Sequence, residues 1–200
     1  RHLYVLYEMG FRNLYGLDLS EELLQVAMQR LATLNGTESE PVSLIQGDMR
    51  VIPHHNSFAS VFSFFTSFGY FQEDAENQAV LSAVYHALRP GGLFLLDYLN
   101  RDHLLSNLIP KDEKKIPGGY IENVRCVTKS CRRVEKTTTV ITKEGERSFH
   151  ESVRLYPQAE MLARFKTAGF VNVRSYGALD GQEFRPKSER LVLVGEKALS

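Results

Sequence analysis

The sequence predicts an α/β domain with a largely parallel sheet. Helical and strand patterns alternate from residue 1 to residue 100, an order typical of parallel strands that are joined by helices. Residues 58–64 form an almost continuous apolar run. Such a run is typical of a strand buried on both faces, so we expect this strand at the centre of the sheet. A shorter strand over 13–18 ends in Asp18, and a capped helix follows it.

The first half of the chain gives helix and strand signals in a regular order. Ser20 is the expected N-cap of a helix whose first turn carries two acids. Asn35 and Gly36 are expected to end this helix, and residues 89–92 to end a later one with a tight turn. The predicted elements are helices over 1–10, 20–31 and 74–88 and strands over 13–18, 42–46, 58–64 and 93–97.

The second half of the chain is richer in β structure. Stretches of β-branched and aromatic residues predict an antiparallel meander over 120–128, 131–142 and 146–156, with a turn at Glu144 and Gly145. A helix over 157–168, which Gly169 ends, and strands over 171–176 and 191–196 complete the chain. We expect a single domain over 1–200, in which 101–156 is an inserted antiparallel subregion that caps the substrate.

Composition argues against several functions. The chain has 24 basic and 24 acidic residues and a formal net charge of +0, so no global field draws it to nucleic acid or to an anionic membrane. Because no apolar stretch approaches a membrane span and no signal-peptide pattern opens the chain, we expect a cytoplasmic protein. Cys126 and Cys131 match no zinc or redox spacing, and His54-His55 has no ligand at suitable spacing, so no metal is expected.

Asp18 is the first candidate for ligand binding. A carboxylate at the carboxyl end of a strand in an open α/β sheet is suited to accept two hydrogen bonds from ribose hydroxyls. The alternative is a structural acid that stabilises the N-terminus of the next helix. A glycine-rich turn normally stands about 20 residues before such an acid. The chain begins with Arg1 and lacks this turn, so we expect the full-length protein to contain a first strand and loop upstream.

Four segments, together with the final helix and two strands, resemble a known family. They are residues 15–20 (YGLDLS), 46–50 (QGDMR), 64–71 (FFTSFGYF) and 88–97 (LRPGGLFLLD). In order and spacing they resemble class I S-adenosylmethionine-dependent methyltransferases, particularly small bacterial ones that act on small molecules. The resemblance implies a Rossmann-like sheet of seven strands, with an antiparallel last strand inserted beside the sixth, and S-adenosylmethionine as cofactor. The missing first strand and glycine-rich loop are the main departure.

The resemblance also implies which residues contact the cofactor. It places the ribose at Asp18, the adenine amine at Asp48, and the adenine ring against Met49. Asp48 is alternatively a loop acid that caps its own turn. Aromatic residues at the end of the strand over 58–64 wall the adenosine, while Phe62 inside that strand is expected to pack in the core. The full set of cofactor candidates is Asp18, Leu19, Asp48, Met49, Phe64 and Phe65.

The catalytic group is less well defined by the sequence. Candidate bases or orienting groups are Tyr70, Tyr98, His150 and Tyr156, and Asp97 and Asn100 are further candidates to line the pocket. His150, Ser152, Arg154 and Tyr156 alternate along one face of a strand. That face is either a substrate wall or a solvated surface, because sheets with one wet face are common. The basic residues of the insertion, Lys129, Arg132, Arg133 and Lys136, are expected to be solvated hairpin charges.

The resemblance implies methyl transfer from S-adenosylmethionine to a small-molecule acceptor by in-line displacement. Alignment and desolvation are expected to contribute most of the catalysis, up to ~7–11 kcal/mol. One alternative is a non-catalytic nucleotide-binding or scaffold protein that has lost the glycine-rich cofactor loop. Another is a nicotinamide-dependent oxidoreductase, which the Gly-Asp-Met segment and the final strand pair disfavour. The methyl acceptor and the oligomeric state stay open.

Overall fold

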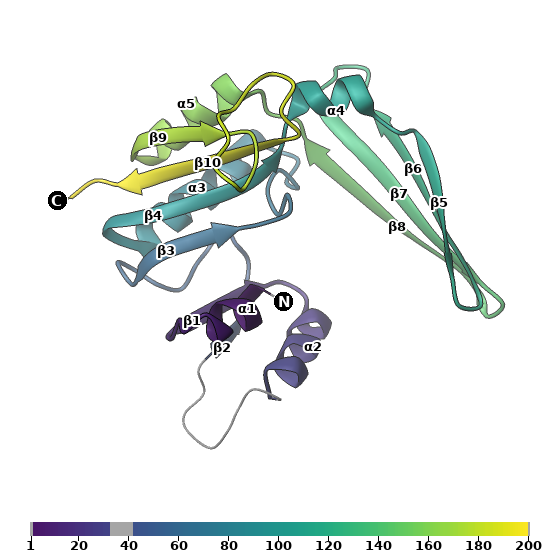
Figure 1. Ribbon diagram of the computed structural model, residues 1–200, viewed down its shortest axis with the longest axis horizontal. Coiled ribbons are helices and arrows are strands. Elements are labelled where there is room, and N and C mark those ends of the chain that lie inside the picture. The colour runs from purple at the N-terminus through teal and green to yellow at the C-terminus, as the bar shows by residue number, and fades with distance from the viewer. Residues whose placement is uncertain (1, 33–41, 200) are drawn as a thin grey trace. The chain divides into compact units, whose positions relative to one another are not determined.

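The computed structural model describes residues 2–32 and 42–199 (Figure 1). The chain divides into two compact units, Arg1–Pro53 and His54–Ser200. No helix in these described ranges is long and apolar enough to cross a membrane. The expectation of one domain over 1–200 stays a prediction.

The first unit contains a two-stranded parallel sheet and two helices. The elements are α1 (His2–Glu8), β1 (Leu14–Asp18), α2 (Glu21–Ala32) and β2 (Val42–Gln46). β1 and β2 pair in parallel from Leu14↔Val42 to Asp18↔Gln46. The Ser20 hydroxyl accepts a 3.2 Å hydrogen bond from the Leu23 amide, which confirms the predicted N-cap. The predicted end of this helix at Asn35 and Gly36 lies outside the described residues.

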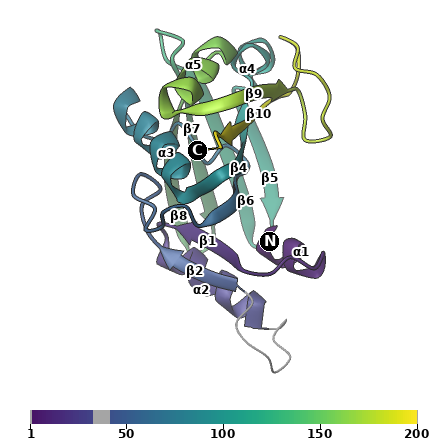
Figure 2. The same cartoon turned by 90° about the vertical axis from the view of Figure 1, so that its left-hand side faces the viewer.

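The second unit is built on a four-stranded mixed sheet. Its strands are β3 (Phe58–Ser63), β4 (Leu88–Leu99), β9 (Phe170–Tyr176) and β10 (Arg190–Lys197), in the order β3-β4-β10-β9. β3 and β4 are parallel, whereas β10 is antiparallel to both neighbours. Helices α3 (Asp74–Ala87) and α5 (Gln158–Ala168) lie on one face of this sheet (Figure 2). β10 is the last strand and lies antiparallel beside β9, which confirms the expectation of an antiparallel last strand beside the sixth.

The core of the second unit lies between this sheet and the two helices. Phe94, Leu96 and Tyr98 alternate along β4 and are fully buried. Phe94 stacks on Phe165 of α5 with ring centroids 5.5 Å apart. Gly169 ends α5 in the left-handed conformation, with φ +102°, which confirms the predicted glycine cap.

Two details of the sheet differ from the expectation. Phe62 on β3 is 47% exposed, so the prediction of a core Phe62 is wrong, while the expected central place of β3 in the complete sheet stays a prediction. The physical reason is that α3 and α5 cover the Phe94 face, whereas Phe62 lies on the opposite face in register with Leu95. The expected turn over 89–92 is instead a bulge inside β4, because Phe58 pairs with Leu88 and Ser60 with Leu93.

The insertion is a four-stranded antiparallel sheet that extends away from the mixed sheet (Figure 1). After α4 (Arg101–Asn107) come β5 (Lys111–Ile116), β6 (Gly119–Val127), β7 (Arg133–Thr142) and β8 (Gly145–Arg154). The sequence predicts β6 to β8 but misses β5, whose residues KDEKKI are charged in all but the last position. An edge strand tolerates such charge. Two ion pairs, Lys111–Glu122 and Arg125–Asp112, link β5 to β6.

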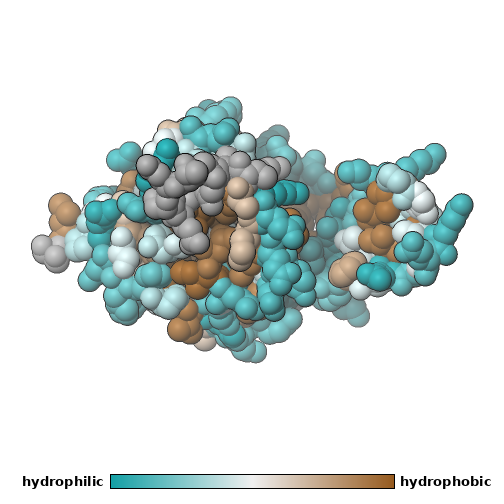
Figure 3. All heavy atoms as spheres, turned by 90° about the horizontal axis from the view of Figure 1, so that it is seen from below, coloured by the Kyte–Doolittle hydropathy of each residue, from teal (hydrophilic) through white to brown (hydrophobic). Residues whose placement is uncertain are grey.

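Part of this antiparallel sheet presents hydrophobic residues to solvent. Tyr120 and Val124 on β6 and Phe149 on β8 are exposed. Figure 3 shows hydrophobic surface on this sheet, at the right of the view. Scattered exposed hydrophobic residues are common on protein surfaces, so they indicate no particular partner.

Candidate functional site

The first unit carries Asp18 at the carboxyl end of β1. One carboxylate oxygen, Oδ1, accepts a 2.9 Å hydrogen bond from the Ser20 amide. The other, Oδ2, has no hydrogen-bond partner among the described residues, and the side chain is exposed. Leu19 beside it is 72% exposed. Asp18 therefore combines the local turn contact with an acceptor atom that faces solvent, and a ribose hydroxyl is a suitable donor for that atom.

Asp48 lies in the loop that follows β2. Its carboxylate accepts hydrogen bonds from the Arg50 amide at 2.8 Å and from the Arg50 guanidinium at 2.9 Å. These Arg50 contacts hold the pKa of Asp48 below its usual value. Asp48 therefore caps its own turn, which is the alternative role expected for it, while its contact with adenine stays a prediction. Met49, between them, is half-buried.

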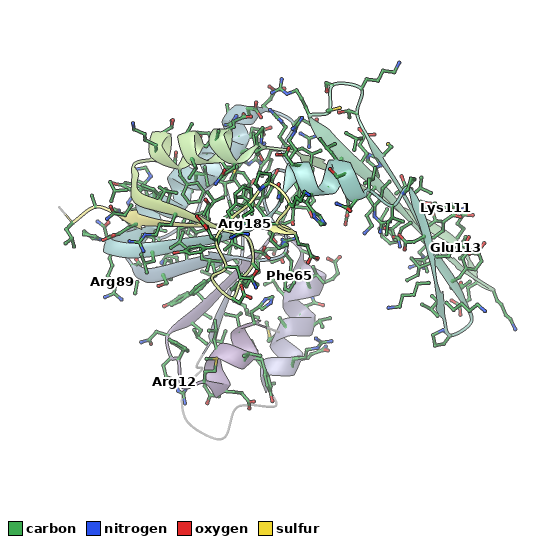
Figure 4. All side chains as sticks on the ribbon, turned by 45° about the horizontal axis from the view of Figure 1, so that its top comes forward. Arg12, Phe65, Arg89, Lys111, Glu113 and Arg185 are labelled. Carbon is green, nitrogen blue, oxygen red and sulfur yellow. The ribbon has the colours of Figure 1, made fainter. Side chains whose placement is uncertain are left out.

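The second unit carries the aromatic candidates on the segment after β3. Phe64 stacks on Phe62 with ring centroids 5.7 Å apart and an interplanar angle of 2°. Phe65 is 58% exposed and lies at the carboxyl end of β3, whereas Arg89 lies at the opposite end of the sheet (Figure 4). Phe65 and Thr66 have φ of 55° and 63°. Two successive non-glycine residues in this region cost about 1–2 kcal/mol each, so other contacts must hold the turn.

Those contacts come from Asp97, which is 1% exposed on β4. Its Oδ2 accepts a 3.0 Å hydrogen bond from the Phe65 amide, and its carbonyl oxygen accepts one of 3.0 Å from the Thr66 amide. Arg190 of β10 donates to Asp97 Oδ1 from Nε at 2.8 Å and to Thr66 Oγ1 from Nη2 at 3.2 Å. The strained turn is therefore fixed by a buried carboxylate and its arginine partner.

Tyr70 lies further along the same loop, and its side chain is partly exposed. Partial burial, with the negative charge of Glu151, raises the pKa of the Tyr70 phenol. Arg133 of β7 donates to the loop carbonyls of Phe71 at 3.0 Å and of Tyr70 at 3.2 Å. The expectation that Arg133 is a solvated hairpin charge is therefore wrong, because the fold brings β7 against this loop.

Tyr98 and Tyr156 are both fully buried. The Tyr98 hydroxyl donates to the Arg154 carbonyl oxygen and accepts a 3.3 Å hydrogen bond from the Tyr156 amide. The Tyr156 hydroxyl donates to Asp74 at 2.6 Å. Burial is the main cause of a raised pKa in both phenols. These contacts favour a structural role, and a catalytic role for either tyrosine stays a prediction.

The polar face that the sequence places on β8 separates into two parts. His150 is exposed, and its Nδ1 lies 3.4 Å from the Thr137 hydroxyl on β7. Arg154 is 6% exposed, and its Nε lies 3.2 Å from Asp74. Arg154 and Tyr156 are therefore buried against α3 and are neither solvated nor grouped with His150.

Asn100 also organises the end of β4. Its amide group donates to the carbonyl oxygens of Pro186 at 3.0 Å and Ser188 at 2.6 Å, and its Oδ1 accepts from the Asp102 amide. Arg133, Arg190 and Asp74 are the residues that sequence reasoning did not identify. Arg133 and Arg190 each begin a strand, and Asp74 begins α3, and charged residues at such positions are also typical of the surface.

Residues 1–92 match a family described as Methyltransferase domain. Among curated proteins, the chain is similar to the dTDP-3-amino-3,4,6-trideoxy-alpha-D-glucopyranose N,N-dimethyltransferase of Streptomyces venezuelae. The two are 28% identical over 165 residues, which are 80% of this chain and 66% of the relative. The chain thus spans slightly less than two thirds of that relative's length.

Solved structures share the fold. The CcbJ methyltransferase from Streptomyces caelestis matches with a TM-score of 0.81 at 17% identity, over 98% of this chain and 78% of that one. S-adenosylmethionine-bound CalS10 from Micromonospora echinaspora, an amino pentose methyltransferase, matches with a TM-score of 0.61 at 25% identity, over 92% and 73%. The predicted α/β methyltransferase fold with an added antiparallel sheet is confirmed.

Residues 1–92 belong to the methyltransferase-domain family, and the chain shares its fold with solved S-adenosylmethionine-dependent methyltransferases. The cofactor of this class is S-adenosylmethionine, and the exposed Asp18 carboxylate fits its ribose hydroxyls in chemical type. The expected family and cofactor are thereby confirmed.

Proposed function

We propose that this protein methylates an amine nitrogen on a small-molecule acceptor, specifically an amino sugar carried on a nucleotide. The observation that supports this most strongly is the 28% identity, over 80% of the chain, to an N,N-dimethyltransferase of a dTDP-linked amino sugar. The similarity to an amino pentose methyltransferase supports the same acceptor class. The first relative is named for methylation on nitrogen, and the second is named for an amino sugar.

In this proposal the cofactor contacts are those that the resemblance implies. Asp18 accepts hydrogen bonds from the ribose, and Leu19 packs beside it. Asp48 and Met49 contact the adenine, which requires the Asp48 carboxylate to share its acceptor atoms with Arg50. The exposed Phe65 ring and the Phe64 ring, which is already ordered by Phe62, cover the adenosine.

The chemistry places modest demands on the side chains. S-adenosylmethionine supplies a methyl group that is already activated for displacement. The protein orients the acceptor nitrogen and excludes water, and such alignment is worth up to about 7–11 kcal/mol. An amine that has lost its proton to solvent needs no further base. Tyr70 is protonated at neutral pH, as an ordinary tyrosine is, and in this proposal its hydroxyl orients the acceptor by hydrogen bonding.

The decisive experiment compares two acceptors that differ in one group. The protein is incubated with S-adenosylmethionine and either a dTDP-linked 3-amino hexose or the same nucleotide sugar with a 3-hydroxyl group. Mass spectrometry then measures methyl incorporation. We expect one or two methyl groups on the amino sugar and none on the hydroxyl analogue.

The opposite results are equally clear. Methylation of the hydroxyl analogue alone would replace the nitrogen acceptor with an oxygen acceptor. Binding of S-adenosylmethionine in calorimetry without methylation of either sugar would contradict the proposed acceptor class. No binding of the cofactor by the protein with its expected upstream strand and loop would favour a scaffold protein.

A further inference from the structure

The loop after β3, residues 64–71, contains both the adenosine-facing and the acceptor-facing candidates. Phe64 and Phe65 are at its beginning, and Tyr70 is near its end. The two ends of the loop are held by different residues of the second unit. Because the loop carries candidates for both ligands, a residue that holds one end of the loop should affect one ligand and not the other.

The beginning of the loop depends on Asp97 and Arg190. Both amides of the strained turn, at Phe65 and Thr66, donate to Asp97. Asp97 is buried, and its carboxylate has the Arg190 guanidinium as counter-ion at 2.7 Å. The same guanidinium donates to the Thr66 hydroxyl. Only a planar group with several N–H donors can make these contacts at once, so lysine is a poor substitute for Arg190.

The end of the loop depends on Arg133. Its Nη1 donates to the Phe71 carbonyl oxygen, and its Nη2 lies 3.4 Å from the Gly69 carbonyl oxygen and 3.2 Å from that of Tyr70. Nε and Nη2 also donate at 2.8 Å to the hydroxyl and the carbonyl oxygen of Ser152 on β8. Among the described residues, no carboxylate pairs with Arg133. Its guanidinium therefore donates mainly to carbonyl oxygens. Through these contacts the inserted sheet holds the loop segment that contains Tyr70.

We propose that Arg190, through Asp97, and Arg133 are two independent positioning residues, the first for the cofactor and the second for the acceptor. This inference rests on the proposed function, because it assumes that Phe64 and Phe65 meet the cofactor and that Tyr70 meets the acceptor. Neither arginine touches a reacting atom in this scheme. Each fixes the backbone of one end of the loop.

The test uses the conservative variants Arg190→Lys and Arg133→Lys, which keep the charge and remove the fork of donors. Arg89→Lys is the matched control, because Arg89 is an exposed arginine at the opposite end of the sheet (Figure 4). Calorimetry gives the Kd for S-adenosylmethionine, and initial rates give the acceptor KM and kcat. We expect Arg190→Lys to weaken cofactor binding about tenfold and to leave the acceptor KM within about twofold. We expect Arg133→Lys to raise the acceptor KM about tenfold and to leave the Kd for S-adenosylmethionine within about twofold.

A second measurement does not depend on ligands. Amide hydrogen exchange, detected by NMR, should rise at Phe65 and Thr66 in Arg190→Lys and over residues 69–71 in Arg133→Lys. The control should leave both segments unchanged. Exchange that rises equally across 64–71 in both variants, or in neither, would overturn the independence of the two ends.

The ligand measurements decide the rest of the inference. If both variants weaken cofactor and acceptor alike while the exchange remains local, the assignment of one ligand to each end is wrong. If the unsubstituted protein binds no S-adenosylmethionine, the proposed function fails. The exchange data then still decide whether the two arginines hold the loop.

Discussion

The phenol of Tyr156 donates a 2.6 Å hydrogen bond to the carboxylate of Asp74, and so links the end of the antiparallel sheet to the first turn of α3. Three arginines surround the same carboxylate: Arg132 at 3.0 Å, and Arg154 and Arg164 at 3.2 Å each. Two of these guanidinium groups, those of Arg154 and Arg164, are largely buried. Asp74 is therefore a hub that connects β8, α5 and the turn between β6 and β7.

Replacement of Asp74 by alanine should destabilise the protein. The change leaves the buried Arg154 without its carboxylate partner on α3 and removes the acceptor of the Tyr156 hydroxyl. Breaking a buried pair from one side typically costs 3–5 kcal/mol, and we expect about 3 kcal/mol here because Asp74 is partly exposed. The measurement is the free energy of unfolding in urea at pH 7.

Glu113→Ala is the matched control for this change. Glu113 on β5 lies 3.9 Å from Lys111, and both side chains are exposed (Figure 4). Such a surface pair contributes within about 0.5 kcal/mol. Equal losses in the two variants would show that Asp74 is not a structural hub.

Acid should destabilise the protein partly through Asp74. Burial would raise the pKa of Asp74, but the Tyr156 hydroxyl and the positive charges of Arg154 and Arg164 outweigh it, and the pKa lies below the usual value. A lowered folded-state pKa contributes stability that is present above the unfolded-state value and is lost as the pH falls through the folded-state value. Urea unfolding at a series of pH values below about 5 measures this loss.

The Asp74→Asn variant isolates that contribution. Since an amide does not titrate, the variant should be less stable than the unsubstituted protein at pH 7 and should lose less further stability in acid. Parallel stability curves for the two proteins would assign the acid sensitivity to other carboxylates.

Gly69→Ala should test the close packing of the loop against the antiparallel sheet. Gly69 has φ +91°, and a Cβ there would lie 3.2 Å from both the Arg154 carbonyl oxygen and the Tyr98 hydroxyl oxygen. Both atoms belong to buried groups that cannot easily move. We expect a loss of about 3 kcal/mol in the free energy of unfolding, from backbone strain and overpacking together.

Gly181→Ala supplies the comparison for backbone strain alone. Gly181 has a similar φ of +87°, but nothing lies within 4 Å of the Cβ position. Its expected loss is about 1 kcal/mol. If Gly69→Ala costs no more than Gly181→Ala, the contact with Tyr98 and Arg154 is looser than described.

Asp18→Ala should strongly weaken binding of S-adenosylmethionine, because it removes the proposed acceptor of the ribose hydroxyls. Loss of charged hydrogen bonds to a ligand typically costs about 1.5–3 kcal/mol, which corresponds to a Kd roughly 10- to 100-fold higher. Isothermal calorimetry measures the change.

Asp180→Ala controls for the local turn. Oδ1 of Asp180 accepts a hydrogen bond from the Gln182 amide two residues later, as Oδ1 of Asp18 does from Ser20. The two substitutions should therefore have similar effects on thermal stability, and only Asp18→Ala should change cofactor affinity. Unchanged affinity in Asp18→Ala would remove Asp18 from the site.

Local sequence patterns predict an element of this fold well where the periodicity of its apolar residues matches the face that is buried. Ser20 caps α2 and Gly169 ends α5 because each signal depends on a few neighbouring residues. β5 was missed because its charged sequence has no apolar alternation, and its ion pairs with β6 form only after the chain has turned back. The sequence predicts a core Phe62 wrongly because an apolar run does not show which face of a strand receives helices.

In the candidate site too, some residues are recognised from local sequence and others only from their contacts in the folded chain. The acid at the end of β1 and the aromatic residues after β3 are visible as local motifs, and the family resemblance assigns them to a cofactor. The roles of Arg133 and Arg190 are not visible. The loop carbonyls that Arg133 contacts lie 62 to 64 residues away in the chain, and the partners of Arg190, Asp97 and Thr66, lie 93 and 124 residues away. A charged residue in a strand is ordinarily solvated, and only its neighbours in space distinguish a positioning residue from a surface charge.

The sequence by itself determined the α/β class, the inserted antiparallel strands and the family resemblance, because these follow from periodicity, turn chemistry and the order of short motifs. The tertiary structure alone decided which charges are buried and what they hold. Asp97 stabilises a strained turn through Arg190, and Asp74 gathers three arginines and a phenol. Both arrangements join residues distant in sequence, and the energy of a buried charge depends on partners that only folding brings within hydrogen-bond distance.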